Sequence, residues 1–140
     1  EPETHVIPLA LQAALTGSNK FAIFGTDYDT PDGTAIRDYI HMLDLADGHL
    51  RAVEYLINGG QTDQFNLGTG TGTSVMELVQ AVRTATGKPL DPHLEPRREG
   101  DPASLVAAPG KAEAALGWKA THSGIEEILT DALKWHLSGG

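Results

Sequence analysis

The chain has 140 residues, of which 40% are hydrophobic and 21% charged, a composition typical of a globular domain with its own core. Its formal net charge of −9 and its ten Lys and Arg residues argue against a nucleic-acid partner, because phosphate binding needs a basic surface. The absence of cysteine excludes disulfides and cysteine zinc sites and favours a cytoplasmic protein. No apolar run reaches the ~20 residues of a membrane-spanning helix, so no membrane contact is expected.

In chain order, hydrophobic periodicity and turn residues predict a helix at 8–15, a strand at 21–25, a loop at 26–35, a strand at 36–42, a helix at 44–57, a strand at 65–67, a helix at 74–87, loops with short extended pieces at 89–108, and helices at 109–117 and 123–137. This order is mixed α and β, with too few strands for a complete doubly wound sheet. The chain opens without methionine or a signal peptide, which suggests a piece of a longer protein.

The ends of three helices carry recognisable signals. Asp44 is a plausible N-cap for the second helix, and the patterns Ser74-x-x-Glu77 and Ser123-x-x-Glu126 each resemble a capping box. One stripe of the second helix is apolar and contains Ala46, Leu50, Val53 and Ile57.

The segment FNLGTGTGTS at 65–74 resembles part of a dinucleotide-binding loop. Gly68 and Gly70 follow a predicted strand and precede a helix, and Asp91 lies about 20 residues further on. The position of the third glycine, however, holds Thr73. A single, incomplete match to the dinucleotide-binding motif is a weak signal, and the simpler interpretation is a flexible turn between strand and helix.

Arginines gather in the segment PRREGD at 96–101. The planar guanidinium groups of Arg97 and Arg98 suit bidentate phosphate binding, and Asp101 could accept hydrogen bonds from a sugar hydroxyl. Adjacent side chains in an extended loop point apart, so one arginine can face a ligand while the other faces solvent. The alternative is a solvated cluster in which the neighbouring acids neutralise both arginines.

Two further groups of polar residues have alternatives of their own. Alternation places Arg37 and Tyr39 on one face of the predicted strand, where they could bind a phosphate or stack on a ring; equally, Arg37 could pair with Asp38 or another nearby acid. A metal site is suggested by His41, Asp44, Asp47 and His49. However, Asp47 and His49 are two residues apart and point to different sides of the helix. Asp44 and Asp47 are better explained as a cap and a first-turn acid. No arrangement predicts a nucleophilic triad.

Four segments carry a resemblance to a known family: IFGTDYDTPDGTAIRDYIHMLDLADGHLRAVEYL, FNLGTGTGTSVMELV, PRREGDPASLVA and LGWKATHSGIEEI. They resemble the UDP-glucose 4-epimerases of the extended short-chain dehydrogenase/reductase family, from about Thr4 to His136. The combination of TPDGT, RDYIH, FNLGTG and PRREGD is specific to the epimerases. The similarity identifies residues 1–140 as the carboxyl-terminal, UDP-sugar-binding portion of such an enzyme.

The resemblance implies an incomplete Rossmann-type α/β fold whose amino-terminal NAD-binding half is absent. The parent enzyme would be a homodimer that interconverts UDP-glucose and UDP-galactose by transient NAD-dependent oxidation at C4. NAD would be bound mainly by the absent half, and this chain alone would be inactive, with no catalytic, cofactor-binding or metal-binding residue of its own. The glycine run at 65–74 would then only turn the chain. An alternative is a UDP-sugar-binding module that does no chemistry.

The same resemblance assigns roles to nine residues, all in substrate binding. His5 and Val6 match the family's His/Asn-Val pair, and Ala22, Ile23 and Phe24 form the strand whose backbone meets the uracil. Arg37 and Arg98 would contact the diphosphate, and Asp101 the ribose. Leu105 would border the sugar, where some relatives carry a tyrosine. Leucine leaves some room there for an N-acetyl group.

Overall fold

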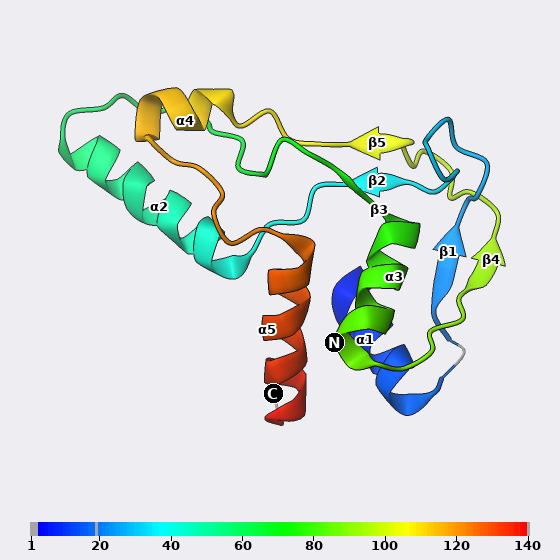
Figure 1. Ribbon diagram of the computed structural model, residues 1–140. Coiled ribbons are helices and arrows are strands. Elements are labelled where there is room, and N and C mark those ends of the chain that lie inside the picture. Colours follow the sequence, from blue (N-terminus) through cyan, green and yellow to red (C-terminus); the bar gives the residue numbers. More distant parts are fainter. Residues whose placement is uncertain (1–2, 19, 140) are drawn as a thin grey trace.

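A computed structural model describes residues 3–18 and 20–139 (Figure 1). The elements of this part of the chain are α1 (Val6–Thr16), β1 (Ala22–Phe24), β2 (Ile36–Arg37), α2 (Met42–Ile57), β3 (Thr73–Ser74), α3 (Val75–Thr86), β4 (His93–Glu95), β5 (Ser104–Leu105), α4 (Gly110–Leu116) and α5 (Ile125–Leu137). The fold is therefore α/β, as the sequence predicts, with short strands that form only a partial sheet structure.

The strands make two small sheets. In the first, β1 and β4 run parallel, with Phe24 opposite Glu95. In the second, β2 lies between β3, to which it is antiparallel, and β5, to which it is parallel. Because β1 and β4 are parallel, the loops that follow them leave the sheet at the same edge. The segment after Phe24 consequently runs beside the segment after Glu95.

The main core lies among helices α1, α3 and α5, with α3 in contact with both of the others. Leu11 of α1, Leu78 of α3 and Leu129 of α5 are almost completely buried. Burying each such side chain contributes about 1.5–3 kcal/mol. This three-helix core supports β1, whose central Ile23 belongs to the same cluster.

Several predicted helix ends are confirmed. Ser74 and Glu77 form a complete capping box at the start of α3, and the helix stops at Gly87, which takes a left-handed conformation with φ of 64°. Helix α4 follows Pro109 and stops at Gly117, which is also left-handed. These signals are local, so the residues that make them need no distant partner.

Two predicted caps are wrong, and one tertiary interaction explains both. The N-cap of α5 is Gly124, because the hydroxyl of Ser123 donates instead to the Asp44 carboxylate. Asp44 lies inside the first turn of α2, and His41 is the N-cap, accepting a hydrogen bond from the amide of Leu43. Long-range hydrogen bonds thus replace the local ones that the sequence suggests.

Two predicted strands are shorter than expected or absent. Of the strand predicted at 36–42, only Ile36 and Arg37 pair with neighbours. The segment predicted as a strand at 65–67 is irregular, and within the described residues no strand pairs with it. A strand is defined by its backbone partners, so a suitable sequence alone does not make one.

The predicted apolar stripe of α2 is exposed. Leu50, Val53 and Ile57 expose 58%, 53% and 78% of their surface, respectively. The buried face of α2 contains Asp44 and Gly48. In Figure 1, α2 and α4 form an arm that extends away from the α1, α3 and α5 core. An apolar face of the arm therefore has no cover within the described residues.

Candidate functional site

A cavity of about 770 Å³ lies beside helix α1, strands β1 and β2 and the loop that follows β4. Six of the residues assigned to the substrate by resemblance contribute to its wall: Val6, Ala22, Phe24, Arg37, Arg98 and Asp101. They come from segments far apart in the sequence. The parallel pairing of β1 and β4 brings the PRREGD segment to the end of β1, which places Arg98 next to Phe24.

The other three assigned residues lie outside this wall. The His5 side chain is 85% exposed and contacts the carboxylate of Glu3 at 2.7 Å. Ile23 is 1% exposed and faces the core, so only its backbone could meet a ligand. Leu105 is 61% exposed, on the strand that pairs with β2.

Arg98 stacks on Phe24, with its guanidinium carbon 3.7 Å from the ring centroid. A stacked guanidinium keeps its N–H groups at its edge, where they can bind an anion in a bidentate manner. Within residues 3–18 and 20–139, no carboxylate forms an ion pair with Arg98. The cation is held in place and its hydrogen-bonding edge remains available.

Arg37 is held more tightly than Arg98. It forms an ion pair with Asp101, and its Nη1 donates to the backbone carbonyls of Ile36 and Pro102 at 2.7 and 3.0 Å. The nearby acid that pairs with Arg37 is thus Asp101, not the adjacent Asp38. Asp101 neutralises one arginine of the cavity, and Arg98 and Lys20 contribute further positive charge to the same wall.

Tyr39 joins this cavity although the resemblance assigned it no role. Its hydroxyl oxygen is buried and has no hydrogen-bond partner within the described residues. Burial raises the pKa of the Tyr39 hydroxyl, against the opposing charge of Arg37, so the group stays a neutral donor. An unpaired buried hydroxyl costs free energy. Strand alternation, which placed Tyr39 beside Arg37, was the sequence signal for this residue.

Backbone amides of the glycine run at 65–74 are hydrogen-bonded to a carboxylate of the chain itself. The carboxylate of Asp38 accepts hydrogen bonds from the amides of Thr69 at 3.0 Å, Gly70 at 3.1 Å and Ala107 at 3.2 Å. A Cβ at Gly68 would lie 2.6 Å from the same carboxylate. Amides that could cradle a phosphate therefore already bind an internal anion, so the described residues do not fit a dinucleotide pyrophosphate here.

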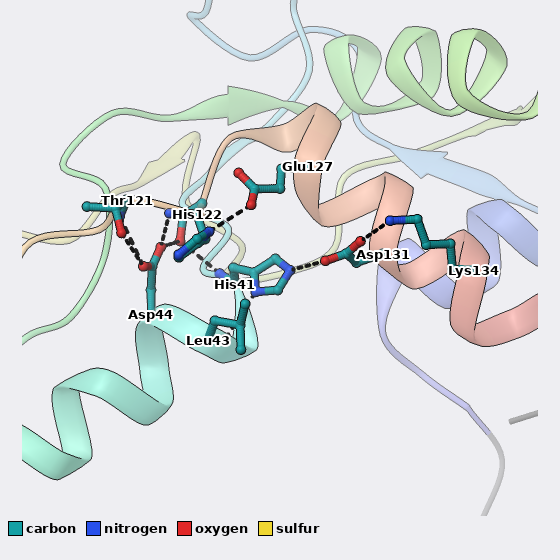
Figure 2. Close-up of polar contacts among 9 residues, drawn as sticks. His41, Leu43, Asp44, Thr121, His122, Glu127, Asp131 and Lys134 are labelled. Atoms are coloured by element: carbon teal, nitrogen blue, oxygen red, sulfur yellow. Dashed lines mark hydrogen bonds and ion pairs between the residues drawn. The ribbon is translucent and has the colours of Figure 1, made fainter.

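A cluster of polar side chains joins α2 to the loop before α5 (Figure 2). The buried Asp44 carboxylate accepts hydrogen bonds from the amides of Thr121 at 3.0 Å and His122 at 2.9 Å, and from the Ser123 hydroxyl at 2.5 Å. Burial raises the pKa of Asp44, but these hydrogen bonds outweigh it and the net shift is downward. The charged carboxylate thus anchors the α2 arm to the start of α5.

Two histidines flank this anchor, with ring centroids 6.1 Å apart. His41 lies 3.5 Å from Asp131 and His122 lies 2.7 Å from Glu127, so each ring has its own carboxylate (Figure 2). Among the residues that the structure describes, no group of three or more His, Cys, Asp or Glu side chains is placed to hold a metal ion. The metal interpretation of the residues around His41 has no geometric support.

Comparisons with known proteins agree with the α/β fold and with the family resemblance of the sequence. The family model described as GDP-mannose 4,6 dehydratase matches residues 1–132. The chain belongs to this family, within the extended short-chain dehydrogenases/reductases. It is 52% identical over 136 residues to the UDP-glucose 4-epimerase of Rhizobium meliloti, an alignment that covers 97% of this chain and 41% of that protein.

Solved structures give the same result. A crystal structure of UDP-glucose 4-epimerase has a TM-score of 0.93 and 49% identity, covering 98% of this chain and 42% of its own. The Stenotrophomonas maltophila enzyme with bound NAD and formylated UDP-arabinopyranose has a TM-score of 0.92 and 38% identity, covering 98% and 40%. The chain thus spans about two fifths of the length of these relatives. No helix in the described part is both long and apolar enough to cross a membrane.

Proposed function

We propose that residues 1–140 are the UDP-sugar-binding portion of an NAD-dependent UDP-glucose 4-epimerase. The observation that carries the proposal is the cavity in which Arg98 offers its guanidinium edge, Arg37 lies close by and the Tyr39 hydroxyl lacks a partner. The unpaired guanidinium of Arg98 and the guanidinium of Arg37, which is paired with Asp101, supply N–H donors that suit a diphosphate with its several acceptor oxygens. The relatives of the same family that match this chain at up to 52% identity are epimerases for a UDP-sugar.

The assigned residues fit a division between the nucleotide, at the wall of the cavity, and the sugar, near Leu105 outside that wall. Arg37 and Arg98 would hold the diphosphate, Asp101 the ribose, and the backbone of β1 the uracil. Leu105 is exposed, apolar and unable to hydrogen-bond, so a sugar near it would be held loosely. Inversion at C4 requires the sugar to present both faces in turn, and a firm hold on UDP with a loose hold on the hexose permits that.

NAD would supply reversible hydride transfer at C4, and we assign its site to the remainder of the parent enzyme. The glycine run of this chain does not fit the cofactor, because Asp38 already binds its amides. This chain alone is therefore expected to bind NAD weakly at most and to be inactive. The parent is proposed to be a cytoplasmic homodimer whose partner is the UDP-sugar, without contact to nucleic acid or membrane.

The bare face of α2 supports an assignment as part of a larger protein. Leu50, Val53 and Ile57 form an exposed apolar stripe, and the strand-like segment at 65–67 lacks a neighbour within the described residues. We propose that the remainder of the epimerase covers both, because its relatives extend over more than twice the length of this chain. Apolar patches of this kind mark interaction surfaces.

The experiment that tests the proposal is an assay of UDP-galactose conversion by the natural protein, with its intact mass measured in parallel. A mass larger than this chain by about one dinucleotide-binding domain, together with NAD-dependent conversion, supports the epimerase. A natural product of only this length that binds UDP without conversion favours the non-catalytic module. Stoichiometric tight binding of NAD by the 140-residue chain would contradict the assignment of the cofactor.

A further inference from the structure

Arg97, the neighbour of Arg98, is directed away from the cavity and onto the loop that follows β1. Its Nε donates to the Asp27 carboxylate at 2.7 Å, and its Nη2 donates to the Asp27 backbone carbonyl. Its guanidinium carbon lies 4.2 Å from the centroid of the Tyr28 ring. Arg97 is thus held by three contacts from one loop rather than extending freely into solvent.

The loop that receives Arg97 is itself well fixed. Tyr28 is 6% exposed, and the amide of Gly25 donates to the Glu95 carbonyl at 2.8 Å. Gly25 has a φ of 86°, and a Cβ there would come within 2.5 Å of the Tyr28 ring and 2.7 Å of Arg97 Cγ. The absence of a side chain at Gly25 therefore allows Arg97 and Tyr28 to approach each other closely.

Arg97 and Arg98 share a peptide bond and pack on two different aromatic rings. Arg97 lies over Tyr28, and Arg98 lies over Phe24 at the wall of the cavity. The Arg98 carbonyl also accepts a hydrogen bond from the amide of Asp101 at 3.2 Å. Whatever fixes the backbone at Arg97 consequently fixes the direction from which Arg98 and Asp101 enter the cavity.

We propose that Arg97, through Asp27 and Tyr28, is a positioning residue that aims Arg98 at the diphosphate of the ligand. We call the contacts of Arg97 with Asp27 and Tyr28 the Arg97 clamp. The inference rests on the proposed binding of UDP in the cavity. Arg97 touches no ligand atom in this scheme, and its effect passes entirely through Arg98.

The clamp and a simple charge effect predict opposite signs for one substitution. Asp27→Ala removes a negative charge near the cavity together with the side-chain acceptor of Arg97 Nε, and electrostatics alone would strengthen the binding of a diphosphate. Loss of the clamp would instead weaken it, because Arg98 would no longer be held in its productive direction. The measurement is the Kd of UDP for the full-length natural protein by calorimetric titration, with thermal melting to verify that each variant is folded.

We expect Asp27→Ala and Arg97→Ala each to weaken UDP binding about fivefold, and the double variant to be no weaker than either single one, as for residues that act as a unit. In an Arg98→Ala background, Arg97→Ala should add no further loss. Arg83→Ala is the matched control, since Arg83 pairs with Asp91 and does not line the cavity. It should leave the Kd unchanged.

Tighter or unchanged binding by Asp27→Ala would overturn the clamp, as would a further loss from Arg97→Ala when Arg98 is already alanine. If Arg97→Ala does not fold, Asp27→Ala carries the test alone. Failure of the underlying function looks different: UDP would not bind the unaltered protein, or Arg98→Ala would have no effect. That result would overturn both proposals, whereas the preceding ones overturn only the clamp.

Discussion

Replacing Asp38 with asparagine should loosen the glycine run at 65–74, because one carboxylate holds most of its turn. One oxygen accepts from the amide and the hydroxyl of Thr69 at 3.0 and 2.6 Å, and the other from the amides of Gly70 and Ala107 at 3.1 and 3.2 Å. Asparagine keeps the shape but turns one of these acceptors into a donor, which leaves at least one N–H group unpaired, since the Thr69 hydroxyl can donate to the Thr71 carbonyl instead. Hydrogen bonds to a charged group contribute about 1.5–3 kcal/mol each, so the loss of one bond and the weakening of the others should cost this part-buried site about 2–4 kcal/mol.

The assay is amide hydrogen exchange at Thr69, Gly70 and Ala107, with urea unfolding for the overall change. Exchange at these three amides should accelerate more than exchange in the α3 core. Asp91→Asn is the control, because the Asp91 side chain is 89% exposed and contacts Arg83 at 3.3 Å; such surface pairs contribute little. Equal effects of the two substitutions, or unchanged exchange at Thr69 and Gly70, would refute the internal-anion interpretation.

Two further predictions concern the sugar and the polar cluster of Figure 2. In the full-length enzyme, Leu105→Tyr should abolish turnover of UDP-N-acetylglucosamine and largely spare UDP-glucose, because a bulky side chain would crowd the N-acetyl group. Steady-state rates on both substrates check this prediction. Unchanged activity on the N-acetylated substrate would mean that another residue controls its access. The hydrogen bond that His122 donates to the Glu127 carboxylate raises the pKa of His122 above its usual value. The stability from this pair should be fully present below a pH of about 6.5 and be lost as pH rises through the higher folded-state pKa. Melting temperatures measured from about pH 5 to about pH 9 should show this decline in the unaltered protein and not in Glu127→Gln. Parallel melting curves for the two proteins would contradict the prediction.

Sequence patterns were most informative where the stabilising contacts are local. The capping box of Ser74 and Glu77 and the stop at Gly87 involve residues within one or two turns, so both could be predicted. The Ser123 box fails because Asp44, 79 residues away, takes the serine hydroxyl. The strand predicted at 65–67 fails because its backbone has no partner within the described residues. The stripe of α2 is apolar, as its spacing predicts, but no other described segment covers it.

The candidate site shows the same division between local and distant information. Composition and spacing drew attention to Arg98 and Arg37 but left solvated clusters and other ion pairs open. The resemblance assigned the residues, and the structure adds what no pattern contains: the pairing of Arg37 with Asp101, the stacking of Arg98 on Phe24, and the unpaired hydroxyl of Tyr39. Each depends on the parallel approach of segments that are far apart in the sequence.

The most direct test of the central claim is the affinity of the full-length protein for UDP with and without Arg98. Arg98→Ala removes the stacked cation that has its hydrogen-bonding edge free, so binding should weaken by about 1.5–3 kcal/mol, or roughly 10- to 150-fold. Arg83→Ala, which removes an arginine that pairs with Asp91 and lies outside the cavity, should bind UDP like the unaltered protein. An unchanged Kd for Arg98→Ala, or equal losses for both variants, would contradict the assignment of this cavity to the UDP-sugar.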